Sequence, residues 1–151
     1  MIAVIQRVSE ASVTVDENII GQIDKGFLIL LGVEKGDDKT EAEVLSRKIA
    51  GLRVFTDEND KMNLSLSDIS GGVLVISNFT LCGNCKKGRR PGFDNAARPD
   101  EANELYEYFC TCMAANGIER IERGEFGADM KVKLLNDGPV TLIINSKELS
   151  R

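Results

Sequence analysis

The run FLILLGV at residues 27–33 is the longest apolar stretch of this 151-residue chain. Gly26 and Gly36 bound it. A short, continuous apolar run between glycines is typical of a strand that is buried on both faces at the centre of a sheet. The run is far too short to span a bilayer, so it predicts a soluble domain without a membrane partner, built around this strand.

Further strands are predicted on both sides of the central run. Val4, Gln6 and Val8 alternate at the start of the chain, and a turn over residues 18–21 leads into Ile23. The other predicted strands cover residues 13–15, 53–55, 73–81, 118–121, 130–135 and 140–144, with a turn at 57–60.

Two amphipathic helices complete the pattern. The first is predicted to begin at a capping box formed by Thr40 and Glu43, and the second follows Pro99 and stops at Gly117. Their apolar stripes are Leu45, Ile49 and Leu52 in the first, and Leu105, Phe109 and Met113 in the second. We therefore expect one α+β domain over residues 1–151. Its sheet should be mostly antiparallel, barrel- or sandwich-like, with two main helices packed on it.

The chain contains no histidine. That excludes Ser-His-Asp and Cys-His triads, an imidazole general base and histidine-containing zinc sites. Any catalysis must use backbone groups, hydroxyls, carboxylates, lysines or the substrate itself. The composition, 42% hydrophobic and 28% charged, is that of an ordinary globular protein. No basic region precedes the first strand, so we expect a cytoplasmic protein without a signal peptide.

The four cysteines form a C-x-x-C at Cys82 and Cys85 and a C-x-C at Cys110 and Cys112. A four-thiolate zinc site or a redox dithiol is one interpretation. However, two cysteines two positions apart in a helix point to different faces. We expect free thiols, no metal and no cofactor, while a thiol or zinc protein stays an alternative.

Charge is distributed unevenly. Residues 83–98 carry a net charge of +4, and the rest of the chain carries −9. The basic side chains of this long predicted loop are Lys86, Lys87, Arg89, Arg90 and Arg98. A basic loop on an acidic body suits contact with a few phosphates, although a solvated charged loop is an equally simple interpretation.

Two polar segments are candidates for a site. Residues 77–81 (SNFTL) end a predicted strand just before the basic loop, and residues 136–141 (NDGPVT) form a predicted tight turn at the start of the last strand. The Gly-Pro pair confines the backbone strongly. Taken alone, both segments are better explained as an ordinary strand and a hairpin turn, because turn chemistry accounts for such dipeptides so often.

Six blocks, spread over nearly the whole chain and in the same order, resemble the D-aminoacyl-tRNA deacylase family. They are residues 3–8 (AVIQRV), 61–66 (KMNLSL), 77–81 (SNFTL), 87–91 (KGRRP), 124–130 (GEFGADM) and 136–141 (NDGPVT). The resemblance implies a homodimeric enzyme that hydrolyses D-aminoacyl-tRNA and mischarged Gly-tRNA. It would reject L-aminoacyl-tRNA and so proofread chirality in translation.

The resemblance also assigns residues. It implies a catalytic segment of Ser77, Asn78, Phe79 and Thr80. It implies a cis bond between Gly138 and Pro139 that enters the partner's active site as a chiral gate, with Arg7 holding the gate and Met130 in the substrate site. The loop residues Lys86, Lys87, Arg89 and Arg90 would bind the tRNA acceptor end, as the loop's charge independently suggests.

The chain departs from the family pattern at three places. Asn78 stands where the family has glutamine, which puts in doubt any hydrogen bond that needs the longer side chain. Residues 82–86 read CGNCK in place of YADTR, and residues 91–93 read PGF in place of PSF. The last two changes lie in the basic loop, so they are expected to alter tRNA preference. None of the three touches the Gly-Pro gate.

The expected chemistry needs only modest catalysis, because an aminoacyl ester is already labile. Backbone N–H groups around Phe79 and Thr80 could stabilise the oxyanion. Thr80 could act as a nucleophile, but no base to activate it is evident, so we favour attack assisted by the terminal ribose 2′-hydroxyl. A non-catalytic RNA-binding module that uses the same loop is the alternative from another class.

Overall fold

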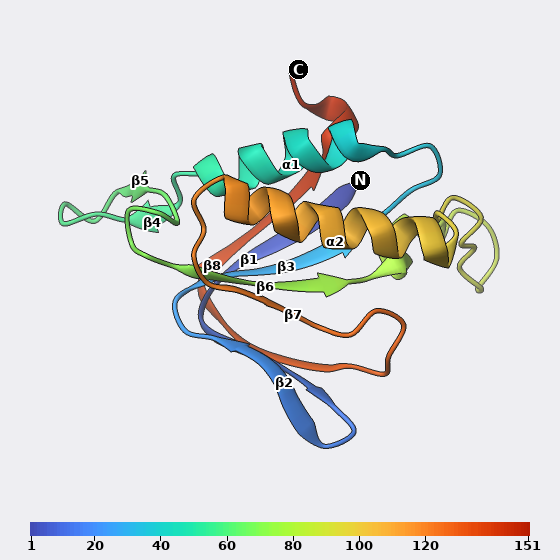
Figure 1. The fold of residues 1–151 in the computed structure, drawn as a ribbon, viewed down its shortest axis with the longest axis horizontal. Coiled ribbons are helices and arrows are strands. Elements are labelled where there is room, and N and C mark those ends of the chain that lie inside the picture. Colours follow the sequence, from blue (N-terminus) through green and yellow to red (C-terminus); the bar gives the residue numbers. More distant parts are fainter.

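Two helices, α1 (Lys39–Gly51) and α2 (Pro99–Ala115), lie side by side across one face of a curved sheet in the computed structural model, which describes residues 1–151 (Figure 1). Neither helix is both long and apolar enough to cross a membrane. The strands are β1 (Ile2–Val15), β2 (Asn18–Ile23), β3 (Gly26–Gly32), β4 (Phe55–Thr56), β5 (Met62–Leu64), β6 (Gly72–Ser77), β7 (Ile121–Arg123) and β8 (Lys131–Asn145). Two short 3₁₀ helices, η1 (Phe79–Cys82) and η2 (Ser146–Glu148), follow β6 and β8.

The long strand β1 organises the sheet. It pairs antiparallel with β8 along one edge, and with β3 and then β2 along the other. The predicted mostly antiparallel, barrel-like sheet with two helices is therefore confirmed. Two pairings, β3 with β6 and β6 with β7, are parallel. They are parallel because α1 connects the first pair and α2 the second, and each crossover returns the chain to the same end of the sheet.

The central-strand prediction is also confirmed. Strand β3 lies between β1 and β6 and is buried on both faces. Phe27, Ile29 and Leu31 face the helices, whereas Leu28 faces the opposite side of the sheet. This two-sided burial explains why the run is continuously apolar and does not alternate.

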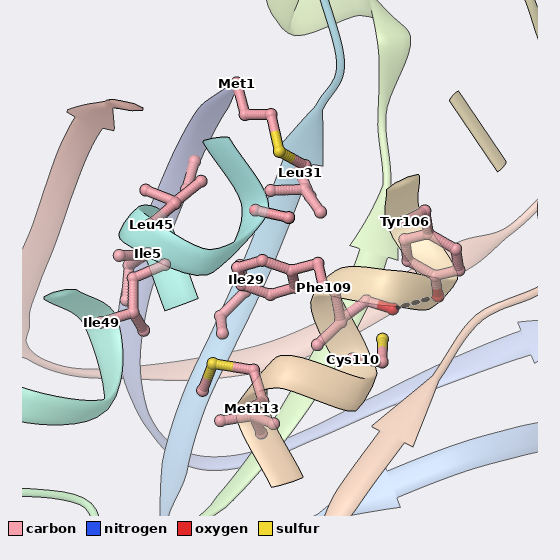
Figure 2. Close-up of a cluster of buried hydrophobic side chains, with 14 of the residues drawn as sticks. Met1, Ile5, Ile29, Leu31, Leu45, Ile49, Tyr106, Phe109, Cys110 and Met113 are labelled. Carbon is pink, nitrogen blue, oxygen red and sulfur yellow. Dashed lines mark hydrogen bonds between the residues drawn. The ribbon is translucent and has the colours of Figure 1, made fainter. Parts of the chain in front are cut away.

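The larger core lies between the sheet and the helices (Figure 2). Ile49 of α1 and Phe109 and Met113 of α2 are fully buried there, as their helical spacing predicted. Tyr106 is buried among them, and its hydroxyl donates a 2.7 Å hydrogen bond to the carbonyl oxygen of Val75. Burial raises the pKa of this hydroxyl, so Tyr106 is a neutral core residue that connects α2 to β6.

A second, smaller core fills the concave side of the sheet. Val8 and Val13 of β1, Ile23 of β2 and Leu74 of β6 are buried there, and Val132 of β8 packs against them. These strands come from both ends of the chain. Their shared core explains why the sheet curls toward a barrel.

Several local predictions are wrong at element boundaries. Residues 18–21 are not a turn but the start of β2, because the chain reverses at Asp16 and Glu17, both with positive φ. Helix α1 is capped not by Thr40 but by Asp38, whose carboxylate accepts from the N–H groups of Thr40 and Glu41. The strand predicted over residues 73–81 ends at Ser77 and passes into η1.

The segment at residues 136–141 is not a tight turn between two strands. Asn136 pairs with Val8 and Thr141 pairs with Gln6, so the four residues between them stand opposite Arg7 alone. The segment is therefore a large bulge within a single strand, β8, which continues in the same direction on both sides.

Candidate functional site

A pocket of about 700 Å³ opens where β3 and β6 end. Leu30 and Ile76 from these strands line it, and Phe126 and Met130, from the segment before β8, form another part of its lining. Residues 96–97 and the first turn of α2 also line it. Because most lining groups are apolar, the pocket suits a ligand with an apolar or aromatic portion and a few polar atoms.

Three of the predicted catalytic residues, Ser77, Asn78 and Phe79, line this pocket together with Met130. Thr80 is the next residue along η1 and is exposed. The N–H of Asn78 donates to the carbonyl oxygen of Leu31 at 2.8 Å, which anchors the segment to β3. The predicted catalytic segment is thus held at the pocket by the end of the sheet.

Asn78 caps η1. Its Oδ1 accepts a 3.2 Å hydrogen bond from the N–H of Thr80 and a short one from the Thr80 hydroxyl. Asparagine is a favoured N-cap because its short side chain reaches back to the first N–H groups of a helix. The shorter amide in place of the family glutamine therefore has a local structural role here.

The aromatic ring of Phe79 is 57% exposed, which is unusual for a phenylalanine. It meets Phe93 of the basic loop edge to face, with ring centroids 5.2 Å apart. This contact joins the predicted catalytic segment to the loop that carries the cations.

The predicted gate residues are held by Arg7. Its side chain is 11% exposed, its Nε donates to the carbonyl oxygen of Asp137 at 3.0 Å, and its Nη1 donates to that of Val54 at 2.7 Å. The Asp137 carboxylate lies 3.6 Å from the same Nε. On the other side of the bulge, Asn136 Nδ2 donates to the carbonyl oxygens of Arg7 and Val140 at 3.1 and 3.0 Å. Arg7 and Asn136 therefore fix the shape of the bulge.

The Gly138–Pro139 peptide bond is cis, as the resemblance implied. Gly138 has a φ of 137°, and a Cβ there would lie 2.9 Å from the backbone nitrogen of Val140 and 3.1 Å from Arg7 Nη2. Only glycine fits this position. Both Gly138 and Pro139 are exposed.

The predicted gate and the predicted catalytic segment do not meet within one chain. None of residues 136–141 lines the pocket at Ser77–Phe79. One segment follows β6 and the other lies within β8, so within one chain they are separate.

The basic loop lies beside the pocket. Lys86, Lys87, Arg89 and Arg90 are exposed, and their side chains make no hydrogen bond or ion pair within the chain. Asn84 and Gly92 exchange backbone hydrogen bonds of 2.7 and 2.9 Å, which close the loop on itself. Its cations are therefore available to an external anion.

The cysteines are free and dispersed. Cys82, Cys110 and Cys112 are buried, and only Cys85, in the basic loop, is exposed. Burial raises the pKa of the Cys82 thiol, and the carboxylates of Glu34 and Asp37 raise it further. A neutral, buried thiol is a poor nucleophile. No group of three or more cysteine, aspartate and glutamate side chains is arranged to hold a metal ion.

Sequence reasoning missed part of this site. Phe126 lies within the block at residues 124–130, but only Met130 was singled out there, although both line the pocket. Ala96 and Ala97 also line it. Small residues in a loop carry no chemical pattern, so only their position in the fold identifies them.

Comparisons with known proteins identify the family of this chain. A family model described as D-Tyr-tRNA(Tyr) deacylase matches residues 4–145. The chain is 57% identical over 148 residues to a D-aminoacyl-tRNA deacylase of Koribacter versatilis (strain Ellin345), covering 98% of this chain and 99% of that protein. It is 56% identical over 148 residues to a protein of the same name from Clostridioides difficile (strain 630), with the same coverage of both chains.

Two solved structures are similar. One, described as c-Myc DNA Unwinding Element Binding Protein, superposes with a TM-score of 0.90 at 40% identity, covering 96% of this chain and 98% of its own. The other, a probable eukaryotic D-amino acid tRNA deacylase, has a TM-score of 0.79 at 16% identity, covering 95% and 97%, and supports the fold alone. With a family model matching nearly its whole length and relatives more than half identical to it, the chain belongs to the D-Tyr-tRNA(Tyr) deacylase family.

Proposed function

We propose that this protein hydrolyses the ester bond of D-aminoacyl-tRNA, and of mischarged Gly-tRNA, while it spares L-aminoacyl-tRNA. Relatives more than half identical over the full chain are named D-aminoacyl-tRNA deacylases. The observation that carries the proposal is the largely apolar pocket at Ser77–Phe79, with an exposed basic loop beside it. Such a site can receive an aminoacyl group and the phosphates of a tRNA end together, and we expect it to act in the cytoplasm.

The first test is the reaction itself. We expect the purified protein to deacylate D-Tyr-tRNA and Gly-tRNA without added metal, and to leave L-Tyr-tRNA intact. Release of radiolabelled amino acid measures each rate. Ester hydrolysis in buffer alone is the control, and equal rates on the two enantiomers would contradict the proposal.

The geometry of η1 narrows the choice of oxyanion donor. The N–H of Thr80 is already donated to Asn78 Oδ1. Phe79 begins η1, so its N–H has no acceptor within that helix. We propose that the Phe79 N–H stabilises the charge that develops on the ester carbonyl oxygen.

The Thr80 hydroxyl is a poor nucleophile in this arrangement. It donates its proton to an amide oxygen, Asn78 Oδ1, which is not a base that could remove that proton. We therefore propose that the ribose 2′-hydroxyl of the terminal adenosine assists attack on the ester, and that Thr80 shapes the site.

Thr80→Val tests this choice. The variant keeps the side-chain shape, so we expect kcat to fall by less than about tenfold, because only one hydrogen bond is removed. Loss of a true nucleophile lowers kcat by about 10⁶ in a well-studied hydrolase. Thr111→Val, on the exposed surface of α2, is the matched control. If activity collapsed in a Thr80→Val variant that still folds and binds substrate, Thr80 would be the nucleophile and the proposal would be wrong.

We propose that Lys86, Lys87, Arg89 and Arg90 bind the phosphates of the single-stranded acceptor end. Replacing all four with glutamine should raise KM. It should also flatten the dependence of log KM on log salt by about 0.7 for each phosphate that the loop no longer neutralises. Neutralising the exposed cations Lys25, Arg47 and Lys48 is the control. An unchanged salt slope in the loop variant would show that the loop is only solvated surface.

We also propose that two copies of the chain complete each other's sites. Ile143 of β8 is 76% exposed, and Val4 pairs with both Ile143 and Leu30. Side chains opposite each other on paired strands lie on the same face, so these three residues form a continuous apolar surface. Leu30 also lines the pocket, so a second copy on this surface would lie at its mouth.

A two-fold dimer on this surface would bring the bulge of one subunit to the pocket of the other. Backbone atoms of Gly138 and Pro139 would then stand where an L-substrate places its side chain. Selectivity would be exclusion by fixed backbone atoms, independent of which amino acid is attached. The firm hold of Arg7 and Asn136 on the bulge supports this role, because exclusion requires a rigid obstacle.

Ile143→Asp tests the dimer. Two copies of a buried carboxylate at a two-fold interface are strongly unfavourable, so we expect a folded monomer that has lost most of its deacylase activity. Ile20→Asp, at the exposed edge of β2, is the control and should remain a dimer. Sedimentation velocity measures the assembly state. A fully active Ile143→Asp monomer would rule out a shared site.

A further inference from the structure

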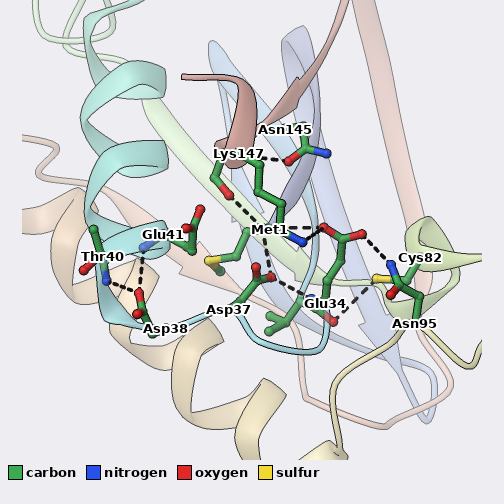
Figure 3. Close-up of polar contacts among 12 residues, drawn as sticks. Met1, Glu34, Asp37, Asp38, Thr40, Glu41, Cys82, Asn95, Asn145 and Lys147 are labelled. Carbon is green, nitrogen blue, oxygen red and sulfur yellow. Dashed lines mark hydrogen bonds and ion pairs between the residues drawn. The ribbon is translucent and has the colours of Figure 1, made fainter. Parts of the chain in front are cut away.

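A buried carboxylate connects the pocket wall to the two ends of the chain (Figure 3). Glu34 follows β3, and its side chain is only 9% exposed. Its Oε1 accepts a 2.7 Å hydrogen bond from Asn95 Nδ2. Its Oε2 lies 3.3 Å from Lys147 Nζ and 3.9 Å from the amino group of Met1.

Asn95 lies between the basic loop and the pocket. The basic residues 86–90 precede it, and Ala96 and Ala97, which line the pocket, follow it directly. Its carbonyl oxygen accepts from the N–H of Lys35 at 2.9 Å, and the N–H of Ala97 donates to the carbonyl oxygen of Val33 at 3.0 Å. The backbone of residues 95–97 is therefore attached to the segment that follows β3.

The side chain of Asn95 strengthens this attachment. A hydrogen bond to an ionised, largely buried carboxylate is stronger than one between neutral groups, and water competes for it less. Residues 83–98 contain no helix or strand, and a loop of that kind opens locally at low cost unless side chains hold it. The Asn95–Glu34 bond is the side-chain hydrogen bond that ties this loop to the segment after β3, beside the apolar contacts that Phe93 makes with Phe79 and Ala97 makes with the core.

We propose that Asn95 is a positioning residue, clamped by Glu34, that holds the pocket wall at residues 96–97 and the basic loop in the conformation that receives the aminoacyl end of the tRNA. This role rests on the proposed deacylase function. Neither residue touches the reacting atoms. They act through the wall and the loop, so they affect substrate binding more than the chemical step.

Lys147 provides a matched control. It binds the same carboxylate, through the other oxygen, but comes from η2 and not from the loop. The hydrogen bond with Glu34 raises the pKa of Lys147, so Lys147 keeps its positive charge at neutral pH. Removing Lys147 therefore perturbs Glu34 without detaching the pocket wall.

The test compares Asn95→Ala with Lys147→Ala. We expect Asn95→Ala to raise KM for D-Tyr-tRNA roughly three- to tenfold, the factor that corresponds to the net contribution of a typical hydrogen bond, with a smaller change in kcat. Lys147→Ala should lower Tm but keep KM within about twofold of the unmodified protein. If KM rose equally in the two variants, Glu34 would only stabilise the fold in general, and the proposal would be wrong.

Two further variants sharpen the result. Asn95→Asp places a second carboxylate against Glu34, so it should raise KM more than Asn95→Ala. Combining Asn95→Asp with Glu34→Gln removes the repulsion and restores a donor and acceptor, so KM should recover by at least threefold. Absence of this recovery would show that Asn95 does not act through Glu34.

Hydrogen–deuterium exchange separates this proposal from the proposed function. The amides of Lys35 and Ala97 bridge the clamp, so Asn95→Ala should speed their exchange roughly three- to tenfold, and Lys147→Ala should not. If the protein failed to deacylate any substrate while this difference held, the function would be wrong and the clamp supported. Unchanged exchange in Asn95→Ala would overturn the clamp whatever the activity.

Discussion

Burial of both faces of β3 is the constraint on which the rest of the structure depends. One face is covered by α1 and α2. The other packs in the smaller core, with residues of β1, β2, β6 and β8. Covering the first face requires helical crossovers, and these make β3, β6 and β7 parallel. Parallel strands end at the same edge of a sheet. The segments that follow β3 and β6 therefore lie together, with Glu34 on one and Ser77–Thr80 on the other, and the pocket opens where they meet.

The main elements could be predicted because their signals are local and redundant. The run at residues 27–33 and the stripe of Leu105, Phe109 and Met113 each repeat one signal several times, and the structure confirms both. The direction of pairing could not be predicted in the same way. Strand periodicity shows which face is buried but not which neighbour pairs, so the parallel half of the sheet follows only from where the helices fall. Boundaries failed where two residues compete for one role, as Asp38 and Thr40 do at the start of α1.

The candidate site, too, could be predicted from the sequence only in part. Ser77–Thr80 and Gly138–Pro139 were identified as site residues only through the family resemblance, because from the residues alone an ordinary strand and a turn explained them better. The bulge at residues 137–140 was mistaken for a turn because Asn-Asp-Gly-Pro satisfies either structure locally. Pairing of Asn136 with Val8, more than a hundred residues away, decides between them. Asn95 and Glu34 gave no signal at all, because an asparagine in a polar loop becomes informative only when its partner is known.

At each part of the proposed site, a polar side chain fixes the position of backbone groups. The chain has no histidine, and the proposed oxyanion donor and gate are backbone groups. A backbone group has no side-chain torsions of its own with which to reach a substrate. Their positions must therefore be fixed by other residues, and polar side chains do this in each case. Asn78 caps η1, Arg7 and Asn136 hold the bulge, and Glu34 holds Asn95 beside the pocket wall. Each of these side chains bonds to backbone or to another positioning group, so the accuracy of the site depends on hydrogen bonds one step removed from the substrate. Substitutions at such positions are expected to weaken substrate binding or selectivity before they unfold the domain, because the two hydrophobic cores remain intact.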